Sequence, residues 1–317
     1  MGRMSRRTVA FSLALLVAAG GLFSCAADGP GSALTTPAPS QSVARSPEPS
    51  EAPSTAAPTK TTGSAPTSTF SVAIRHISLS RGKDRPLPTT IWYPRSGDGP
   101  FPVIVFSHGL TSEPSAYSAL LTRWARAGFV VAAPSFPHTH YRVSDYRPLD
   151  VVNQPADASY VLTKVLALGS KSGDPLAGRL DTKHVAAAGH SAGGITTIGM
   201  FTGKRDARLV AGIVLAGRQV LPAPFTGPAA SILFVHGKLD RTVPYQDGLA
   251  AYRAVPWPKA LMSVTKGGHV TISKGFEPVL DTTTDFWRWS LYGDPAAKAR
   301  LKADATAGGT ATLTADL

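Results

Sequence analysis

The sequence predicts one α/β domain built on a doubly wound, mostly parallel sheet, and three observations predict it. Short apolar segments alternate with helical patterns over roughly 225 residues from Phe70 onward. Segment 103–106 is a continuous apolar run, as expected of a strand buried on both faces. Apolar residues make up 43% of the 317 residues and charged residues only 16%, which is enough to bury a substantial core.

Each element follows from its own pattern. Segment 72–79 alternates as a half-exposed strand does, and segment 87–93 is rich in Thr, Ile and aromatic residues. Segment 115–127 places Leu120, Leu121 and Trp124 on one helix face and stops at Gly128. Further strands are expected at 129–133, 184–188, 212–216, 231–235 and 260–264, and further helices at 156–168, 192–201, 247–254 and 277–292. Residues 294–317 are expected to form a packed or frayed tail.

The first 25 residues resemble a bacterial lipoprotein signal. Arg3, Arg6 and Arg7 precede a short apolar run, which is the pattern of an export signal and too short for a stable membrane span. The run ends at Leu22-Phe23-Ser24-Cys25, which resembles a lipobox, and Cys25 is the only cysteine of the chain. We therefore expect a lipid anchor on Cys25. An ordinary signal peptide remains the alternative, and the general secretory and twin-arginine routes both stay open.

Residues 26–69 are predicted to be a disordered linker. Of these 44 residues, 36 are Ala, Pro, Ser, Thr or Gly, and such a segment buries too little apolar area to offset its conformational entropy. Glycosylation of its Ser and Thr residues stays open. The folded domain is then expected to span residues 70–317.

The charge of the chain bears on its partners. The first 25 residues hold three arginines and no acid, so the net charge of +12 falls to +9 for the rest. A positive protein favours anionic surfaces such as wall polymers or lipid headgroups. The basic residues are scattered along the chain, and this argues against nucleic acid as a partner.

Ser191 carries the strongest functional signal. Gly189-His190-Ser191-Ala192-Gly193 follows an apolar strand and opens a helix, which is the strand–turn–helix context of a G-x-S-x-G nucleophile elbow. The helix N-terminus favours the negative charge that develops during nucleophilic attack. Ser191 is therefore the predicted nucleophile.

A serine hydroxyl needs a base, and the base needs a group that orients it. Asp240 lies just after the strand 231–235, and His269 lies just after the strand 260–264. Both are therefore expected at the carboxyl ends of the strands, where Ser191 also lies. This gives the chain order serine, acid, histidine. We assign His269 as general base and Asp240 as its orienting carboxylate. The alternatives are an ordinary turn aspartate and an ordinary loop histidine.

An oxyanion hole needs two N–H donors aimed at one point. The predicted donors are the N–H groups of Ala192, after the nucleophile, and of Leu110, in the loop after the strand 103–106. His108 and His236 each precede a glycine at a strand end and are expected to support loops, and His190 is expected to pack beside the elbow. No metal and no cofactor are predicted, because His138 and His140 have no evident third ligand and are expected to contact substrate or solvent.

These segments resemble the α/β-hydrolase superfamily over residues 71–292. The likeness is greatest to esterases of the platelet-activating-factor acetylhydrolase and dienelactone-hydrolase type. It rests on Thr89-Thr90-Ile91-Trp92-Tyr93-Pro94, on the segment 101–109, on the elbow and on the Asp240 and His269 loops. Ser191 stands where dienelactone hydrolases have a cysteine. Segment 217–230 is too short for the helical cap of lid-type lipases, so the resemblance implies an open site.

The resulting hypothesis is an extracytoplasmic, lipid-anchored serine esterase that acts on short-chain esters through an acyl-enzyme. We expect the protein to be a monomer. The alternatives are a cutinase-like hydrolase of polyesters, and a binding lipoprotein on a hydrolase fold with no catalytic function. The pocket walls are expected at 134–150 and 221–225, with Trp257 nearby.

The lipid anchor gives a first prediction. Cys25→Ala removes the acceptor of the lipid, so the variant is expected to leave the membrane fraction and appear in the soluble one. The measurement is cell fractionation followed by immunoblotting. Continued fractionation of the variant with membranes would count against lipidation.

Overall fold

The computed structural model describes residues 65–269 and 276–317. The predicted export segment with Cys25, and the predicted linker up to residue 64, lie outside the described residues. The described residues all belong to one compact unit. Within the described part of the chain, no helix combines the length and the apolar character needed to span a membrane.

The elements alternate along the chain as the patterns predict. The strands are β1 (Val72–Ser80), β2 (Pro86–Pro94), β3 (Phe101–Ser107), β4 (Val130–Pro134), β5 (Leu180–His190), β6 (Leu209–Leu215), β7 (Ser231–Gly237), β8 (Lys259–Val264) and β9 (Ala311–Asp316). The α-helices are α1 (Ser118–Arg126), α2 (Gln154–Leu166), α3 (Ala192–Gly199), α4 (Tyr245–Ala254), α5 (Glu277–Tyr292) and α6 (Pro295–Thr306). Short 3-10 turns are η1 (Pro114–Tyr117), η2 (Pro148–Val152), η3 (Ala167–Ser170) and η4 (Ala307–Gly309).

The nine strands of the described residues form one sheet in the order β1-β2-β4-β3-β5-β6-β7-β8-β9. The pairs from β4 through β8 are all parallel, whereas β1, β2 and β9 pair in antiparallel fashion at the two edges. This is the α/β-hydrolase arrangement that the resemblance implied, and the predicted fold class is confirmed. The segment 217–230 between β6 and β7 contains no helix, so it forms no helical cap over the carboxyl ends of these two strands.

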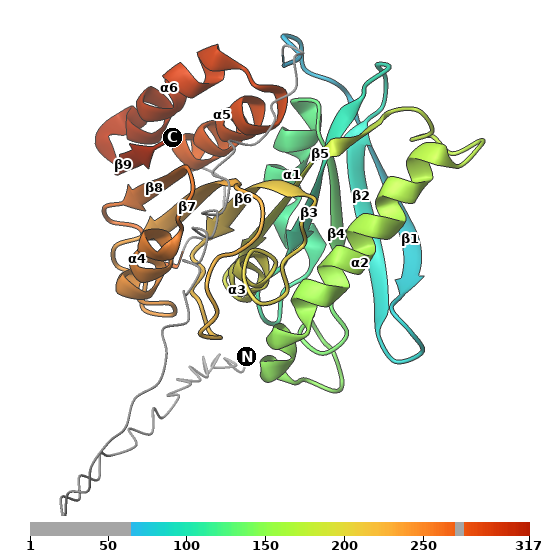
Figure 1. Ribbon diagram of the computed structural model, residues 1–317, viewed down its shortest axis with the longest axis horizontal. Helices are drawn as coiled ribbons and strands as arrows, with labels where there is room; N and C mark the ends of the chain where they lie inside the picture. The colour runs from blue at the N-terminus through green and yellow to red at the C-terminus, as the bar shows by residue number, and fades with distance from the viewer. Residues whose placement is uncertain (1–64, 270–275) are drawn as a thin grey trace, which may run out of the picture. The chain divides into compact units, whose positions relative to one another are not determined.

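Successive side chains of the central strands pack alternately into two separate hydrophobic cores, one on each face of the sheet. Ile104 and Phe106 of β3 join the core beneath α1, α5 and α6, whereas Val103 and Val105 join the core beneath α2, α3 and α4. The period of two in a strand explains this division. Figure 1 shows α2 in front of the sheet and α1 behind it.

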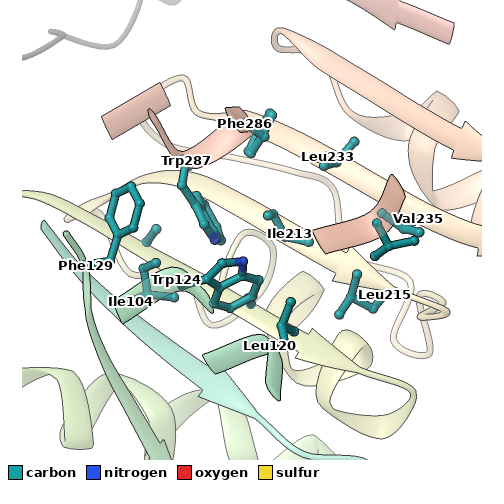
Figure 2. Close-up of a cluster of buried hydrophobic side chains, with 14 of the residues drawn as sticks. Ile104, Leu120, Trp124, Phe129, Ile213, Leu215, Leu233, Val235, Phe286 and Trp287 are labelled. Carbon is teal, nitrogen blue, oxygen red and sulfur yellow. The ribbon is translucent and has the colours of Figure 1, made fainter. Parts of the chain in front are cut away.

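The core beneath α1 and α5 is centred on two tryptophans. Trp124 of α1 and Trp287 of α5 meet edge to face, with ring centroids 5.6 Å apart, and both are fully buried (Figure 2). The indole N–H of Trp124 donates to Thr283 Oγ1 at 3.2 Å, which satisfies its polar atom inside the core. This contact joins the first helix of the domain to a helix more than 150 residues further along the chain.

Of the two forms expected for residues 294–317, a packed or a frayed tail, the structure shows the packed one. Asp294 caps α6 by accepting hydrogen bonds from the N–H groups of Ala296 and Ala297, and Leu301 is buried beneath the helix. β9 then pairs with β8 over six residues and covers that edge of the sheet. Alanine is depleted in strands, so the alanines of this segment weaken the sequence signal for a strand.

The packed domain also begins earlier than the predicted boundary at Phe70. Ala65 is only 6% exposed and belongs to the core that contains Trp124. Pro66 lies so close to Gly128 that a Cβ on that glycine would be 2.9 Å from the proline ring. Expression of the domain therefore needs a start before residue 65, and residues 53–317 provide it.

Two carboxyl groups meet between α5 and α6. Asp285 accepts hydrogen bonds from Arg300 at 2.7 and 3.1 Å. Burial, followed by the neighbouring carboxylate of Asp285, raises the pKa of Asp304 to about 6. One carboxylate oxygen of Asp304 is buried and has no hydrogen-bond partner among the described residues. Keeping this group ionised therefore costs stability.

This pair predicts a pH-dependent gain of stability for Asp304→Asn. Because the folded pKa lies above that of the unfolded chain, the folded protein binds more protons between about pH 4 and 6, and stability falls as pH rises through that range. The variant should therefore melt at a higher temperature than wild type at pH 7.5 and at an equal temperature at pH 4. Differential scanning calorimetry measures this, with the exposed Asp84→Asn as control. A difference that does not change with pH would contradict the assignment.

Candidate active site

Ser191 stands at a sharp turn between β5 and α3. Its backbone has φ 57° and ψ −117°, a conformation that residues other than glycine rarely adopt. Its N–H donates to Leu215 O at 2.9 Å, and its own carbonyl accepts from Ile195 N at 3.1 Å. The serine is thereby held, half-exposed, at the N-terminus of α3.

Two glycines make this turn possible. A Cβ on Gly189 would lie 2.2 Å from Gly193 O, and a Cβ on Gly193 would lie 1.9 Å from Ser107 O at the end of β3. No side chain fits at either position. The G-x-S-x-G spacing is therefore required by the close approach of β5, α3 and β3.

Asp240 and His269 are hydrogen-bonded to each other. His269 Nδ1 lies 2.7 Å from Asp240 Oδ2, and the side chain of Asp240 is fully buried while that of His269 is 20% exposed. The other carboxylate oxygen accepts from the N–H groups of Thr242 and Val243 at 2.8 and 2.9 Å. Both carboxylate oxygens of Asp240 thus accept hydrogen bonds, so the carboxylate orients the imidazole and favours the tautomer with its proton on Nδ1.

The imidazole of His269 also lies beside the elbow. Its ring packs on the ring of His190, the residue before Ser191, with centroids 4.8 Å apart and planes inclined at 48°. The loops of Asp240 and His269 approach closely, because a Cβ on Gly237 would lie 2.1 Å from Gly268 O. The fold thus brings the neighbourhoods of the three predicted residues together at the carboxyl ends of β5, β7 and β8.

The loop after β3 completes the arrangement. A Cβ on Gly109 would lie 3.3 Å from the Cβ of Ser191, so the Gly109–Leu110 peptide borders the serine. Gly109 O accepts from His108 Nδ1 at 2.7 Å, which directs the N–H of Leu110 the opposite way in the planar trans peptide. Within residues 65–269 and 276–317, neither the N–H of Leu110 nor that of Ala192 has an acceptor.

The neighbouring histidines support loops, as the sequence predicts. His108 Nε2 accepts from Phe136 N at 3.1 Å, and burial lowers the pKa of His108 to about 4, so the ring stays neutral. His236 Nε2 donates to Val243 O at 2.9 Å, and burial lowers its pKa as well. His190 is buried beside the elbow and contacts the hydroxyl of Tyr117 at 3.0 Å.

His138 and His140 lie on the loop after β4. His138 Nδ1 lies 3.2 Å from the carbonyl of Asp145, and His140 Nδ1 donates to Tyr141 O at 2.8 Å. In the part of the chain that the structure describes, no group of three or more His, Cys, Asp or Glu residues could hold a metal ion.

The prediction for Trp257 as a pocket wall is wrong. Trp257 precedes β8 and so lies at the amino end of that strand, whereas Ser191 and His269 lie at the carboxyl ends. Its indole packs on Phe201 and Phe225 at centroid distances of 6.4 and 6.0 Å, under the guanidinium of Arg205. Phe225 belongs to this distant cluster as well, and an aromatic residue near a strand gives no sequence signal of which end it packs against.

A groove runs along α3 from Ile195, one helical turn beyond Ser191. Its volume is about 170 Å³, and the side chains of Val151, Val152, Val220 and Leu221 line it. Ile195 is the residue that a sequence argument could have found, because it lies at i+4 from the nucleophile on the same helix face. The valines carry no such signal, because their place depends on tertiary contacts.

One of those tertiary contacts is a buried ion-pair network. Arg85 of the β1–β2 hairpin donates to Asp150 at 2.7 and 2.9 Å and to Asp157 at 2.5 to 3.0 Å. It ties η2 and the start of α2 to the hairpin. The network thereby fixes Val151 and Val152 beside the groove.

A family model described as chlorophyllase matches residues 58–216, which is half of the chain. The matched segment contains Leu110, Ser191 and Ala192 and ends before Asp240 and His269. No curated protein matches the chain.

The elbow geometry predicts that Gly193→Ala cannot be accommodated. The new Cβ would fall 1.9 Å from Ser107 O, and a clash with backbone inside a packed region costs on the order of 1–3 kcal/mol or more of unfolding free energy. Urea denaturation measures this cost. Gly268→Ala serves as control, because its Cβ would meet nothing within 4 Å. Equal stabilities of the two variants would contradict the close approach.

Proposed function

The chain belongs to the chlorophyllase family, and from that premise we propose that it is a serine hydrolase that cleaves carboxylic esters through an acyl-enzyme. The observation that carries the proposal is the Asp240–His269 hydrogen bond of 2.7 Å. Its imidazole packs on His190, the residue that precedes a serine held in a strained turn. A half-exposed serine hydroxyl, a buried carboxylate and an imidazole, in that order along the chain, are the parts of a catalytic triad.

The proposed first half-reaction acylates the serine. Ser191 Oγ attacks the ester carbonyl while His269 Nε2 takes its proton, and the carbonyl π bond becomes an oxyanion. When that intermediate collapses, the bond to the alcohol oxygen breaks, and His269 gives its proton to the departing alcohol. Asp240 stabilises the imidazolium that exists between these two proton transfers.

In the second half-reaction, water takes the place of the serine as nucleophile. His269 removes a proton from water as it attacks the acyl carbon, and then returns the proton to Ser191 Oγ as the acid leaves. In both halves the N–H groups of Leu110 and Ala192 are the proposed donors to the oxyanion. Such preorganised donors contribute on the order of 10²–10³-fold in rate each.

The substrate class that we propose is short-chain esters, handled outside the cytoplasm by a protein anchored through Cys25. Two features support an open, accessible site: no helix lies within 217–230, and Ser191 is half-exposed. A cutinase-like hydrolase of polyesters and a binding protein without catalytic function are the alternatives that the following experiment distinguishes.

The test compares wild type with Ser191→Ala and Asp240→Asn in residues 53–317, using p-nitrophenyl acetate as substrate. Ser191→Ala should lower kcat by about 10³-fold or more, and Asp240→Asn by about 10⁴-fold, because asparagine favours the wrong imidazole tautomer. Asp247→Asn is the matched control, since Asp247 sits half-exposed against Arg218 and should leave kcat within about twofold.

The outcomes separate the candidate functions. Equal background rates in folded wild type and Ser191→Ala would contradict an esterase and favour a binding role. For an active enzyme, rates on acetyl, butyryl and octanoyl esters, on a polyester film and on chlorophyll, the compound in the family's name, identify the substrate. Faster hydrolysis of the film than of the dissolved esters would favour the cutinase-like reading.

A further inference from the structure

Exposed large apolar side chains are concentrated on the loops at the carboxyl ends of the strands. Seven such side chains occur in the described residues, and six lie on the loops that follow β4, β6 and β7, at the carboxyl ends of the strands. We call these six the apolar rim: Tyr141, Tyr146, Leu149, Val220, Leu221 and Leu239. The seventh, Ile74, lies on the edge strand β1. Single exposed apolar residues are ordinary, but this concentration beside one site is not.

The loops that carry the apolar rim are joined to one another and to the site. Leu149 precedes Val151 and Val152, which share one groove with Val220 and Leu221. The N–H of Tyr141 donates to Ser112 O at 2.8 Å, in the loop that carries Leu110.

On the other side, the N–H of Leu239 donates to Gly267 O at 2.9 Å, two residues before His269. The apolar rim therefore borders the loops of Ser191, Leu110 and His269. Leu149 and Leu239 are its most exposed members, at 69% and 61%.

The same loops carry a surplus of positive charge. Arg147 is paired with Asp145, and Arg218 with Asp247. Three exposed cations on these loops, and a fourth on the loop after β8 that carries His269, have no ion pair within the described residues: Arg142, Lys238, Arg241 and Lys266. Against them stand two exposed acids with no ion pair among the described residues: Glu113 in the loop after β3, and Glu277 at the start of α5. The loops at the carboxyl ends of the strands, which carry the apolar rim, thus have a net positive charge.

We propose that the apolar rim and its four cations dock the domain on an anionic lipid surface, so that Ser191 faces esters held in that surface. The proposal rests on the proposed function for its substrate, but the docking itself does not. Apolar side chains that enter the headgroup region, flanked by basic residues, are the general chemistry of proteins that lie on anionic membranes. An uncharged polymer film would make no use of the cations.

The test is sedimentation of residues 53–317 with vesicles of phosphatidylcholine alone, or of phosphatidylcholine and phosphatidylglycerol in equal parts. Wild type should bind the anionic vesicles, and 0.5 M salt should weaken that binding because the charges are exposed. Leu149→Ser with Leu239→Ser should lower the binding at least about tenfold. Ile74→Ser, a comparably exposed residue on β1, is the matched control and should change it by less than about twofold.

Two further measurements keep docking and catalysis apart. Ser191→Ala should bind vesicles as wild type does, whether or not the protein is an esterase. Lys238→Gln with Lys266→Gln should weaken binding to anionic vesicles at least about fivefold. In both double variants, hydrolysis of dissolved p-nitrophenyl acetate should stay within about twofold of wild type.

Several results would overturn the proposal. They are absence of binding by wild type, equal binding to both kinds of vesicle, and equal loss of binding in Ile74→Ser and in the leucine variant. A dimer in size-exclusion chromatography that the leucine variant converts to a monomer, without vesicle binding by wild type, would show instead that the apolar rim joins two copies of the chain.

Discussion

The site depends on one close approach, that of the β5–α3 turn to the end of β3. Gly193 lies so near Ser107 that even a methyl group is excluded, and Ser191 takes its strained backbone because the chain must reverse at that point. This single contact sets the position of the serine, of the N-terminus of α3 and of the Gly109–Leu110 peptide. Strain of this kind persists only where the surrounding structure enforces it, and here two buried cores on either side of the sheet do so.

The other parts of the site are arranged around that turn by loops that hold one another. His108 fixes the Gly109–Leu110 peptide from one side, and its neutrality is assured by the burial that lowers its pKa to about 4. Two backbone N–H groups hold one carboxylate oxygen of Asp240, while the other oxygen contacts His269. The Gly109–Leu110 peptide and Asp240 are thus oriented by neighbouring groups that take no part in the proposed reaction. Such fixed orientation of the reacting groups is the physical basis of preorganisation.

Most of the strands and helices could be predicted from the sequence, because the central strands are buried on both faces and therefore consist of apolar runs. The elbow could be predicted since glycine on both sides of a serine is a local signal, and Asp240 and His269 followed from their places after strands. The tail could not be read in the same way: β9 is built largely from alanine and threonine, and its pairing with β8 is a tertiary contact. Trp257 and the ion pairs of Arg85 show the same limit, because composition does not reveal which end of a sheet a side chain packs against.

The most direct test of the account is covalent labelling of native residues 53–317 with a fluorophosphonate, followed by peptide mass spectrometry. The account predicts one adduct, on the peptide that contains Ser191, which disappears when the protein is heat-denatured before labelling and when His269 is replaced by alanine. Absence of an adduct on the folded protein, or an adduct on another residue, would contradict the claim that this strained serine is an activated nucleophile.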